Sequence, residues 1–175
     1  MDLSKQSVDQ AEEQLVSELA RLGIGYLSRQ SADNSSRVYA PHELIAGLVC
    51  QPSSRVRSAL IALMLAYPGY AVYIPRALRL LKTDQAQILR FFYTAAGILQ
   101  TIYAQVLQSS LGADWRNLPD LFSDELGLTG DSPAVRLRNL ARLHARWSGE
   151  NLNWAGTYEN AALHLLRLWD REKVW

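Results

Sequence analysis

We predict an all-α fold for this chain of 175 residues from three features of its sequence. Apolar residues recur at three- and four-residue spacings, as on one face of a helix, whereas no stretch shows the two-residue alternation of a half-buried strand. Prolines and glycines fall between the apolar segments, where helices begin and end. A chain of this length is expected to form one domain over residues 1–175, a bundle of seven or eight helices around a long central helix at about 84–111.

The first expected helix spans about residues 8–22. Its apolar residues follow helical spacing, Ser7 with Gln10 resembles a capping box, and Gly23 supplies a natural stop. The polar, aperiodic residues that follow predict a flexible loop near residues 28–37, because their side chains hydrogen-bond readily to their own backbone.

Several short helices are expected over residues 41–82. Pro41 suits the first turn of a helix, and three later prolines interrupt an otherwise helical pattern, so this stretch cannot be one long rod. Residues 41–82 loosely resemble one HEAT-type helix pair, in which the run from Ser53 to Leu60 is the start of the second helix. One pair does not make a repeat protein.

The longest expected helix, at about 84–111, carries no charge between Phe91 and Ala113. Its polar residues fall on one narrow strip and its large apolar residues fill the opposite arc, which favours an amphipathic helix over a membrane span. Solvent-facing strips usually carry Lys and Glu, so a neutral strip predicts either a nearly surrounded central helix or an interface with a partner or a second copy of the chain. The predicted interface residues are Thr94, Thr101, Gln105 and Gln108.

Two helices are expected near the C-terminus. The first runs over about 133–147, between a cap at Asp131 or Ser132 and a stop at Gly149. The second follows a cap at Thr157 and runs close to the end of the chain.

Charge and cysteine content narrow the class of protein. The net charge is +1, so the chain does not produce the strong positive electrostatic field of an obligate nucleic-acid binder. The only cysteine, Cys50, has no partner for an internal disulfide or a multi-cysteine zinc site, so we expect no metal and no cofactor. With no signal peptide at its start, the chain is expected to be cytoplasmic and to make no membrane contact.

Arginines outnumber lysines by 15 to 3, and three of them repeat at four-residue spacing on the helix at 133–147. Arg138, Arg142 and Arg146 form one stripe opposite the apolar residues of that helix. The stripe is either a solvated face or a surface that tracks phosphates, since a guanidinium group favours planar recognition through paired hydrogen bonds.

The run from Arg138 to His144 resembles the Arg-x(4–6)-His signature of HEPN-family domains, and Asn139 after the arginine also fits that family. HEPN domains are all-α and include metal-independent ribonucleases and toxins paired with nucleotidyltransferases. The resemblance implies that Arg138 stabilises a phosphate and that His144 transfers protons during attack by an RNA 2′-hydroxyl, across a dimer. Six residues on a straight helix place the two side chains about 120° apart, so one site would need an irregular helix or a second chain.

The segment at 149–160 concentrates asparagines, glycines, acids and aromatic residues. One interpretation is a helix connection in which polar side chains satisfy the backbone and Trp154 fills the core. The other is a binding loop for a small ligand or a partner. The binding residues would then be Glu150, Asn151, Trp154, Tyr158 and Glu159.

No catalytic motif is present, so our leading interpretation is a non-enzymatic, cytosolic helical interaction, adaptor or regulatory protein. Its partner would be a protein, including a second copy of the chain. The first alternative is a HEPN-like metal-independent ribonuclease toxin, or its toxin–antitoxin partner, which would bind RNA. The second is a small-ligand-binding regulator that uses the loop at 149–160.

Overall fold

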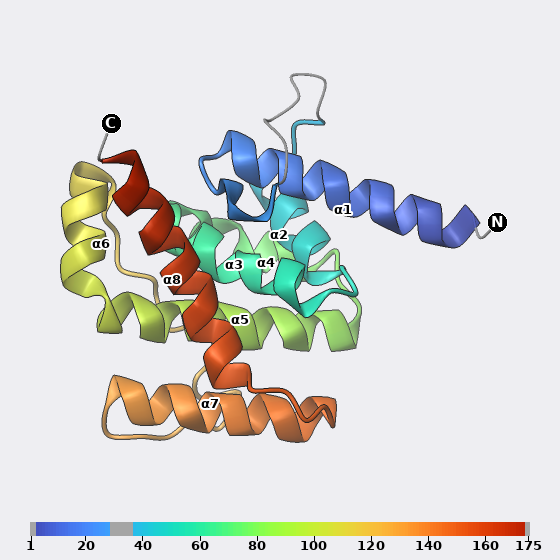
Figure 1. Ribbon diagram of the computed structural model, residues 1–175. Helices are drawn as coiled ribbons and strands as arrows, with labels where there is room; N and C mark the ends of the chain where they lie inside the picture. The colour runs from blue at the N-terminus through green and yellow to red at the C-terminus, as the bar shows by residue number, and fades with distance from the viewer. Residues whose placement is uncertain (1–2, 29–36, 174–175) are drawn as a thin grey trace.

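The computed structural model describes residues 3–28 and 37–173, and it confirms the all-α class (Figure 1). Eight α-helices and no strands are found within these residues. The flexible loop predicted near 28–37 falls mainly on residues 29–36, which lie outside the described residues. The helices are α1 (Leu3–Arg21), α2 (Pro41–Val49), α3 (Ser54–Ala66), α4 (Ile74–Leu78), α5 (Thr83–Ile102), α6 (Ala104–Leu111), α7 (Pro133–Ser148) and α8 (Trp154–Glu172).

Helices α3 and α5 form the centre of the core. Almost every residue of α3 from Val56 to Leu65 is buried, because this helix is apolar on all sides and other helices surround it. The prolines expected to break residues 41–82 do so: Pro68 begins the 3₁₀ helix η2 (Pro68–Tyr73), and α4 follows directly. Helix α2 packs against α3, while the HEAT-type resemblance of this pair stays a prediction.

The predicted long helix at 84–111 is wrong in one respect, because it breaks at Tyr103 into α5 and α6. Tyr103 leaves helical geometry with φ −102° and ψ 20°, and α6 then turns upward beside the end of α8 (Figure 1). A straight continuation would have carried Leu107 away from the molecule, whereas the bend leaves Leu107 fully buried. The gain from burying one leucine side chain, about 2 kcal/mol, favours the bend.

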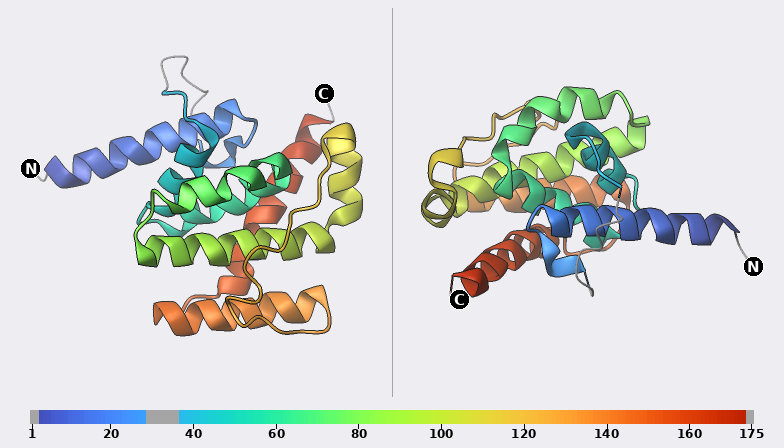
Figure 2. Two further views of the ribbon diagram at one scale, coloured as in Figure 1. Left: turned by 180° about the vertical axis from the view of Figure 1, so that it is seen from behind. Right: turned by 90° about the horizontal axis from the view of Figure 1, so that it is seen from above.

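After the short 3₁₀ helix η3 (Gly112–Asp114), residues 115–131 cross the face of α5 that lies opposite α8 (Figure 2). Buried side chains of α5 hold this irregular segment. The side-chain amide of Gln100 donates to the Arg116 carbonyl oxygen at 2.8 Å and accepts from the Leu118 backbone N–H at 2.8 Å. The Tyr93 hydroxyl donates to the Pro119 carbonyl oxygen at 2.8 Å.

The last two helices begin and end at polar caps. The Ser132 hydroxyl oxygen accepts from the Val135 N–H at the start of α7, so Ser132 and not Asp131 is the cap of the two that the sequence offered. Gly149 ends that helix with a left-handed φ of 68°, as predicted. Helix α8 begins at Trp154, because the side chain of Asn153 accepts from the Gly156 N–H at 3.0 Å, so the cap lies four residues before the predicted one. Thr157 is therefore inside the helix.

The helices are stacked in layers with α8 lying across them (Figures 1 and 2). Helix α7 forms the outermost layer beneath α5, and α1 lies on the opposite side of the molecule. Helix α8 runs diagonally from α7 past α5 and α3 towards α6, and it packs on α3, α5 and α7. One face of α7 is therefore covered by α5 and α8, and the other faces outward.

Candidate functional site

The predicted binding loop at 149–160 does not assemble one open site. Trp154 and Tyr158 are buried in the core, whereas Glu150, Asn151 and Glu159 are exposed. The two aromatic residues therefore cannot contact a ligand at the surface, and the interpretation of this segment as a helix connection agrees with the structure. Asn153 starts α8 directly before Trp154, and the Trp154 ring packs against Phe92 of α5 and His144 of α7.

His144 lies at the centre of this aromatic core, with 2% of its surface exposed. Its ring stacks between those of Phe91 and Trp154, with ring centroids 4.4 Å and 3.6 Å away and interplanar angles of 4° and 16°. His144 Nδ1 and the Tyr158 hydroxyl group form a hydrogen bond of 2.6 Å. Which of the two donates depends on the tautomer of the imidazole. We define the aromatic stack as Phe91, His144, Trp154 and Tyr158.

Burial keeps His144 uncharged. Loss of water around the ring, together with the positive charge of Arg57, lowers the pKa of His144 from 6.5 to about 3. An imidazole with this pKa is neutral at physiological pH, and no surface opens to it. Arg138 is exposed on α7, so the structure does not bring the two residues of the HEPN-like motif together in one site.

The neutral strip predicted as an interface is divided by the bend at Tyr103. Thr94 is buried and Thr101 is exposed on α5, whereas Gln105 and Gln108 are exposed on α6, which points in another direction. The four residues therefore do not form one continuous surface. Two apolar residues beside the bend at Tyr103, Ile102 and Val106, are 40% and 49% exposed. Helical spacing predicts both on the apolar side of one long helix.

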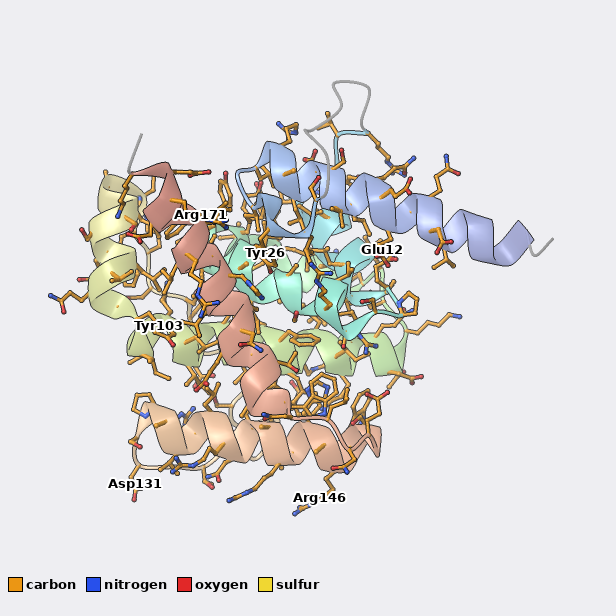
Figure 3. The ribbon with its side chains drawn as sticks, in the orientation of Figure 1. Glu12, Tyr26, Tyr103, Asp131, Arg146 and Arg171 are labelled. Atoms are coloured by element: carbon orange, nitrogen blue, oxygen red, sulfur yellow. The ribbon has the colours of Figure 1, made fainter. Side chains whose placement is uncertain are left out.

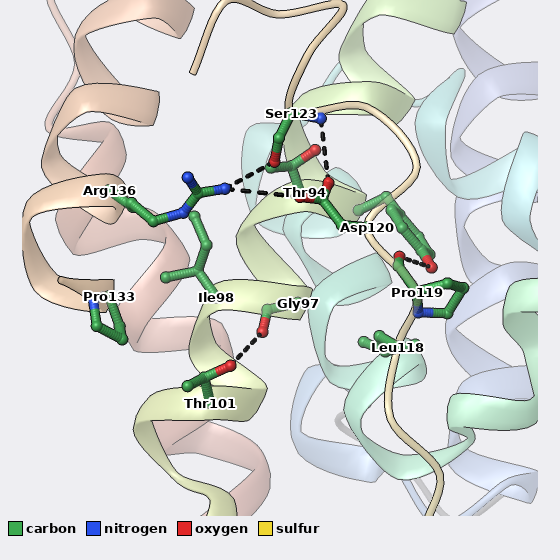
Figure 4. A pocket seen from close by; sticks show the side chains of 11 residues that line it. Thr94, Gly97, Ile98, Thr101, Leu118, Pro119, Asp120, Ser123, Pro133 and Arg136 are labelled. Atoms are coloured by element: carbon green, nitrogen blue, oxygen red, sulfur yellow. Dashed lines mark hydrogen bonds and ion pairs between the residues drawn. The ribbon is translucent and has the colours of Figure 1, made fainter. Parts of the chain in front are cut away.

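The α5 part of the strip instead faces a cavity of about 270 Å³ (Figure 4). The cavity lies between α5, residues 118–123 and the start of α7. Arg136 extends across it and donates from Nη2 to the Ser123 hydroxyl oxygen at 2.8 Å, with Asp120 Oδ2 at 3.7 Å. Periodicity alone does not predict this cavity, because its three walls come from distant parts of the chain. We refer to it as the α5–α7 cavity.

The outward side of α7 carries Arg138, Arg142 and Arg146, as the sequence predicted, and we call it the arginine face. All three side chains are exposed, and Arg146 points away from the body of the molecule (Figure 3). None of the three forms an ion pair with another described residue. By contrast, Arg90 is 3.0 Å from Glu125, so other arginines of this chain do find acidic partners.

Side chains beside the arginine face fix its shape. The Asn139 amide donates to the Thr129 carbonyl oxygen at 2.8 Å, and Arg142 Nη1 donates to Asn139 Oδ1 at 3.2 Å. Trp147, at the end of α7, is 42% exposed although it continues the apolar side of the helix. Helical spacing places Trp147 opposite the arginines of α7 and does not predict this exposure.

No three His, Cys, Asp or Glu side chains among residues 3–28 and 37–173 are grouped so that they could hold a metal ion. Within the same ranges no single helix has both the length and the apolar character to cross a membrane. Ser54–Ala66 and Pro68–Leu78 reach that length and composition only together, as a pair bent by 116°.

Comparisons with known proteins give no family for this chain: no protein-family model, curated protein or solved structure matches it significantly.

Proposed function

We propose that this chain is a non-enzymatic helical interaction protein whose arginine face binds an acidic surface of a partner protein. The observation that carries the proposal is the set of three exposed arginines on one helix face, none with an ion-pair partner among the described residues. Guanidinium groups bind carboxylates through paired hydrogen bonds, and arginine and tryptophan are enriched where interfaces gain most of their energy.

Rigidity supports the proposal. The arginine face lies on a helix of 16 residues, capped at both ends, whose inner side packs on α5 and α8. Arg142 is further held by Asn139. Side chains presented by a fixed helix lose less conformational entropy on binding than side chains on a loop. Trp147 at the edge of the face adds apolar area beside the charges.

The balance of charge favours a protein partner over RNA. The net charge of +1 does not create the strong global field that nucleic-acid binding domains use. The HEPN-like alternative needs Arg138 and His144 in one open site, and the burial of His144 lends it no support. A cytoplasmic location is part of the proposal, supported by the single cysteine of the chain.

The test measures binding of two fluorescent probes by anisotropy, a glutamate-rich helical peptide and a single-stranded RNA oligonucleotide. We expect the peptide to bind, with an affinity that falls as salt rises. A triple variant, Arg138→Glu, Arg142→Glu and Arg146→Glu, is expected to weaken peptide binding at least about tenfold, since each lost charge-assisted contact contributes about 1 kcal/mol or more.

The matched control carries the same change of charge elsewhere: Arg76→Glu, Arg79→Glu and Arg171→Glu, all at exposed positions on α4 and α8 or beside them. It is expected to weaken binding only through the overall field. Equal losses in the two triple variants would refute a specific role for the arginine face. Tight binding of the RNA without binding of the peptide would replace the protein partner with a nucleic acid.

A further inference from the structure

We propose that the arginine face binds the free end of α1 in a second copy of the chain. The inference rests on the proposed function, because it names the acidic surface that the arginine face recognises. We define the free end as residues 7–13 of α1. Three observations carry the inference: this end projects from the molecule, its carboxylates form no ion pair with other described residues, and their spacing matches that of the arginines.

The free end of α1 lies outside the core. Residues 7–10 are all exposed, so every side of this helical turn faces away from the rest of the chain. Burial begins further along α1, where Leu15 and Leu19 are 2% and 0% exposed. In each view the N-terminal part of α1 projects beyond the other helices (Figures 1 and 2). Helices in proteins owe most of their stability to packing, so this end gains stability when a second copy covers it.

Three carboxylates of the free end share one side of the helix. Glu12 and Glu13 follow Asp9 by three and four residues, the separations that place side chains next to one another on a helix. None of the three forms an ion pair with another described residue. The acid nearer the core differs, because Glu18 is buried and pairs with Arg21 at 2.6 Å. The negative charge at the free end is therefore available to a partner.

The spacing of these carboxylates matches that of the arginine face. Asp9 and Glu13 are four residues apart, as are successive arginines of α7, and four residues span about 6 Å along a helix. A free end that lies along α7 therefore places Asp9 and Glu13 opposite two successive arginines. Each carboxylate then accepts paired hydrogen bonds from a guanidinium group. Val8, one turn before Glu12 and 39% exposed, adds apolar area to the contact.

Both surfaces of the contact belong to this chain, which favours a second copy as the partner. Helices α1 and α7 lie on opposite sides of the molecule, so the contact cannot form within one copy (Figure 1). The net charge of +1 leaves little repulsion between whole copies. The contact is head-to-tail, because the free end of one copy binds α7 of the next and leaves that copy's own free end open. Association therefore continues beyond a pair of copies.

The first experiment measures the mean mass of the full chain by light scattering and analytical ultracentrifugation at rising concentration. At low salt we expect the mass to exceed that of one chain and to keep rising, and we expect it to fall again as salt screens the charges. A chain that stays monomeric at low salt would overturn the inference, and so would association that salt leaves unchanged. Binding of the glutamate-rich peptide by a monomeric chain would leave the proposed function intact, so the two proposals fail separately.

Charge reversal on each surface identifies the contact. The α1 variant reverses the free end: Asp9→Lys, Glu12→Lys and Glu13→Lys. This variant and the triple variant of the arginine face are each expected to associate at least about tenfold more weakly, because like charges then face each other. An equimolar mixture of the two should associate again, since the free end of one still matches α7 of the other. A mixture that stays monomeric would overturn the inference.

Two control variants carry the same changes of net charge away from the contact. One is Arg76→Glu, Arg79→Glu and Arg171→Glu, and the other reverses three exposed acids, Asp114→Lys, Glu150→Lys and Glu172→Lys. Each control alone should still associate, because both of its contact surfaces are unchanged. Equal losses in a control and in the variant that it matches would assign the association to overall charge and overturn the inference.

A cross-link locates the contact directly. Val8→p-benzoylphenylalanine places a photoreactive group on the free end, and mixing with isotope-labelled chain marks the cross-links that join two copies. We expect these cross-links on α7. Val72→p-benzoylphenylalanine, at an exposed site of η2, is the control and should give none there. Cross-links from the free end to other elements, with none to α7, would overturn the assignment.

Discussion

His144 is a polar residue used as a core aromatic residue. It stacks between Phe91 and Trp154 and shares its hydrogen bond with Tyr158, so its ring contributes both apolar contact and a satisfied polar group. The same burial raises the pKa of Tyr158 well above its ordinary value, which keeps the phenol protonated. The pair is therefore stable only while both groups are uncharged.

Acid should destabilise the protein through His144. The pKa of His144 is lowered from 6.5 to about 3 on folding, so the unfolded chain binds a proton across this range and the folded chain does not. The contribution of His144 is thus complete above about pH 6.5 and is lost as the pH falls towards 3. The free energy of unfolding lost in this way is roughly 3 kcal/mol at pH 4. Urea denaturation at several pH values measures this loss.

The comparison variant is His144→Phe with Tyr158→Phe, which keeps two stacked rings and removes both polar groups. Its free energy of unfolding should vary less between pH 7 and pH 4 than that of the natural chain. The same pH dependence in both proteins would contradict the assignment to His144.

Gln100 is one of the buried side chains of α5 that hold residues 115–131. It is 4% exposed and bonds the backbone on both sides of Asn117. Gln100→Leu would leave the Arg116 carbonyl and the Leu118 N–H unpaired, at a cost of about 1–3 kcal/mol. We expect limited proteolysis to cut residues 115–120 faster in this variant. Gln105→Leu on the exposed side of α6 is the control and should leave cleavage unchanged.

At the scale of the element, helix starts depend on single side chains that sequence patterns identify only in part. The pattern predicted Asp131 or Ser132 as the cap of α7, and in the structure the cap is Ser132. For α8 the pattern predicted Thr157, whereas Asn153 is the capping residue and Thr157 donates from its hydroxyl to the Asn153 carbonyl oxygen. Asn and Thr are both good caps, so spacing alone did not separate them.

Asn153→Ala should therefore cost about 1 kcal/mol of the free energy of unfolding, because the Gly156 N–H loses its acceptor. Thr157→Ala should cost less, since no backbone N–H of the first turn depends on Thr157. Urea denaturation of the two variants makes the comparison. A larger loss of unfolding free energy for Thr157→Ala than for Asn153→Ala would identify Thr157 as the cap of α8 and contradict this prediction.

Local signals were sufficient for much of the fold. The helical periodicity, Pro41, the pair Asp131 and Ser132, and Gly149 predicted the class of fold, the start of α2 and the bounds of α7, because these depend on neighbouring residues. The bend at Tyr103 was not predicted, since no proline or glycine marks it and its cause is the distant packing of Leu107.

Among the candidate sites, too, some features depend on neighbouring residues and others on segments that are distant in the sequence. The spacing of Arg138, Arg142 and Arg146 predicted the arginine face, because a helix alone determines which residues share a side. The burial of Trp154 and His144 depends on α5, which is far away in the sequence. The α5–α7 cavity requires three separate segments to meet, so no local pattern could have indicated it.

At the scale of the molecule, α7 is an outer layer that has fewer neighbouring helices than α3. It packs on α5 and α8, whereas α3 is enclosed by α2, α5 and α8. Protection of backbone amides from hydrogen exchange should therefore be lower in α7 than in α3, because α7 can separate without disrupting the central core. Mass spectrometry after exchange in heavy water measures this order. Equal protection of both helices would show that the molecule opens only as a whole.

Helix α7 carries the arginine face on its outer side and His144 on its inner side. A partner that binds α7 only while α7 is packed on α5 and α8 stabilises that packed state. The binding free energy therefore also stabilises the aromatic stack. By thermodynamic linkage, such a partner would make Trp154 harder for the quencher acrylamide to reach, although Trp154 lies on the far side of α7 from the contact. The fluorescence of an interior tryptophan would then report events at the surface.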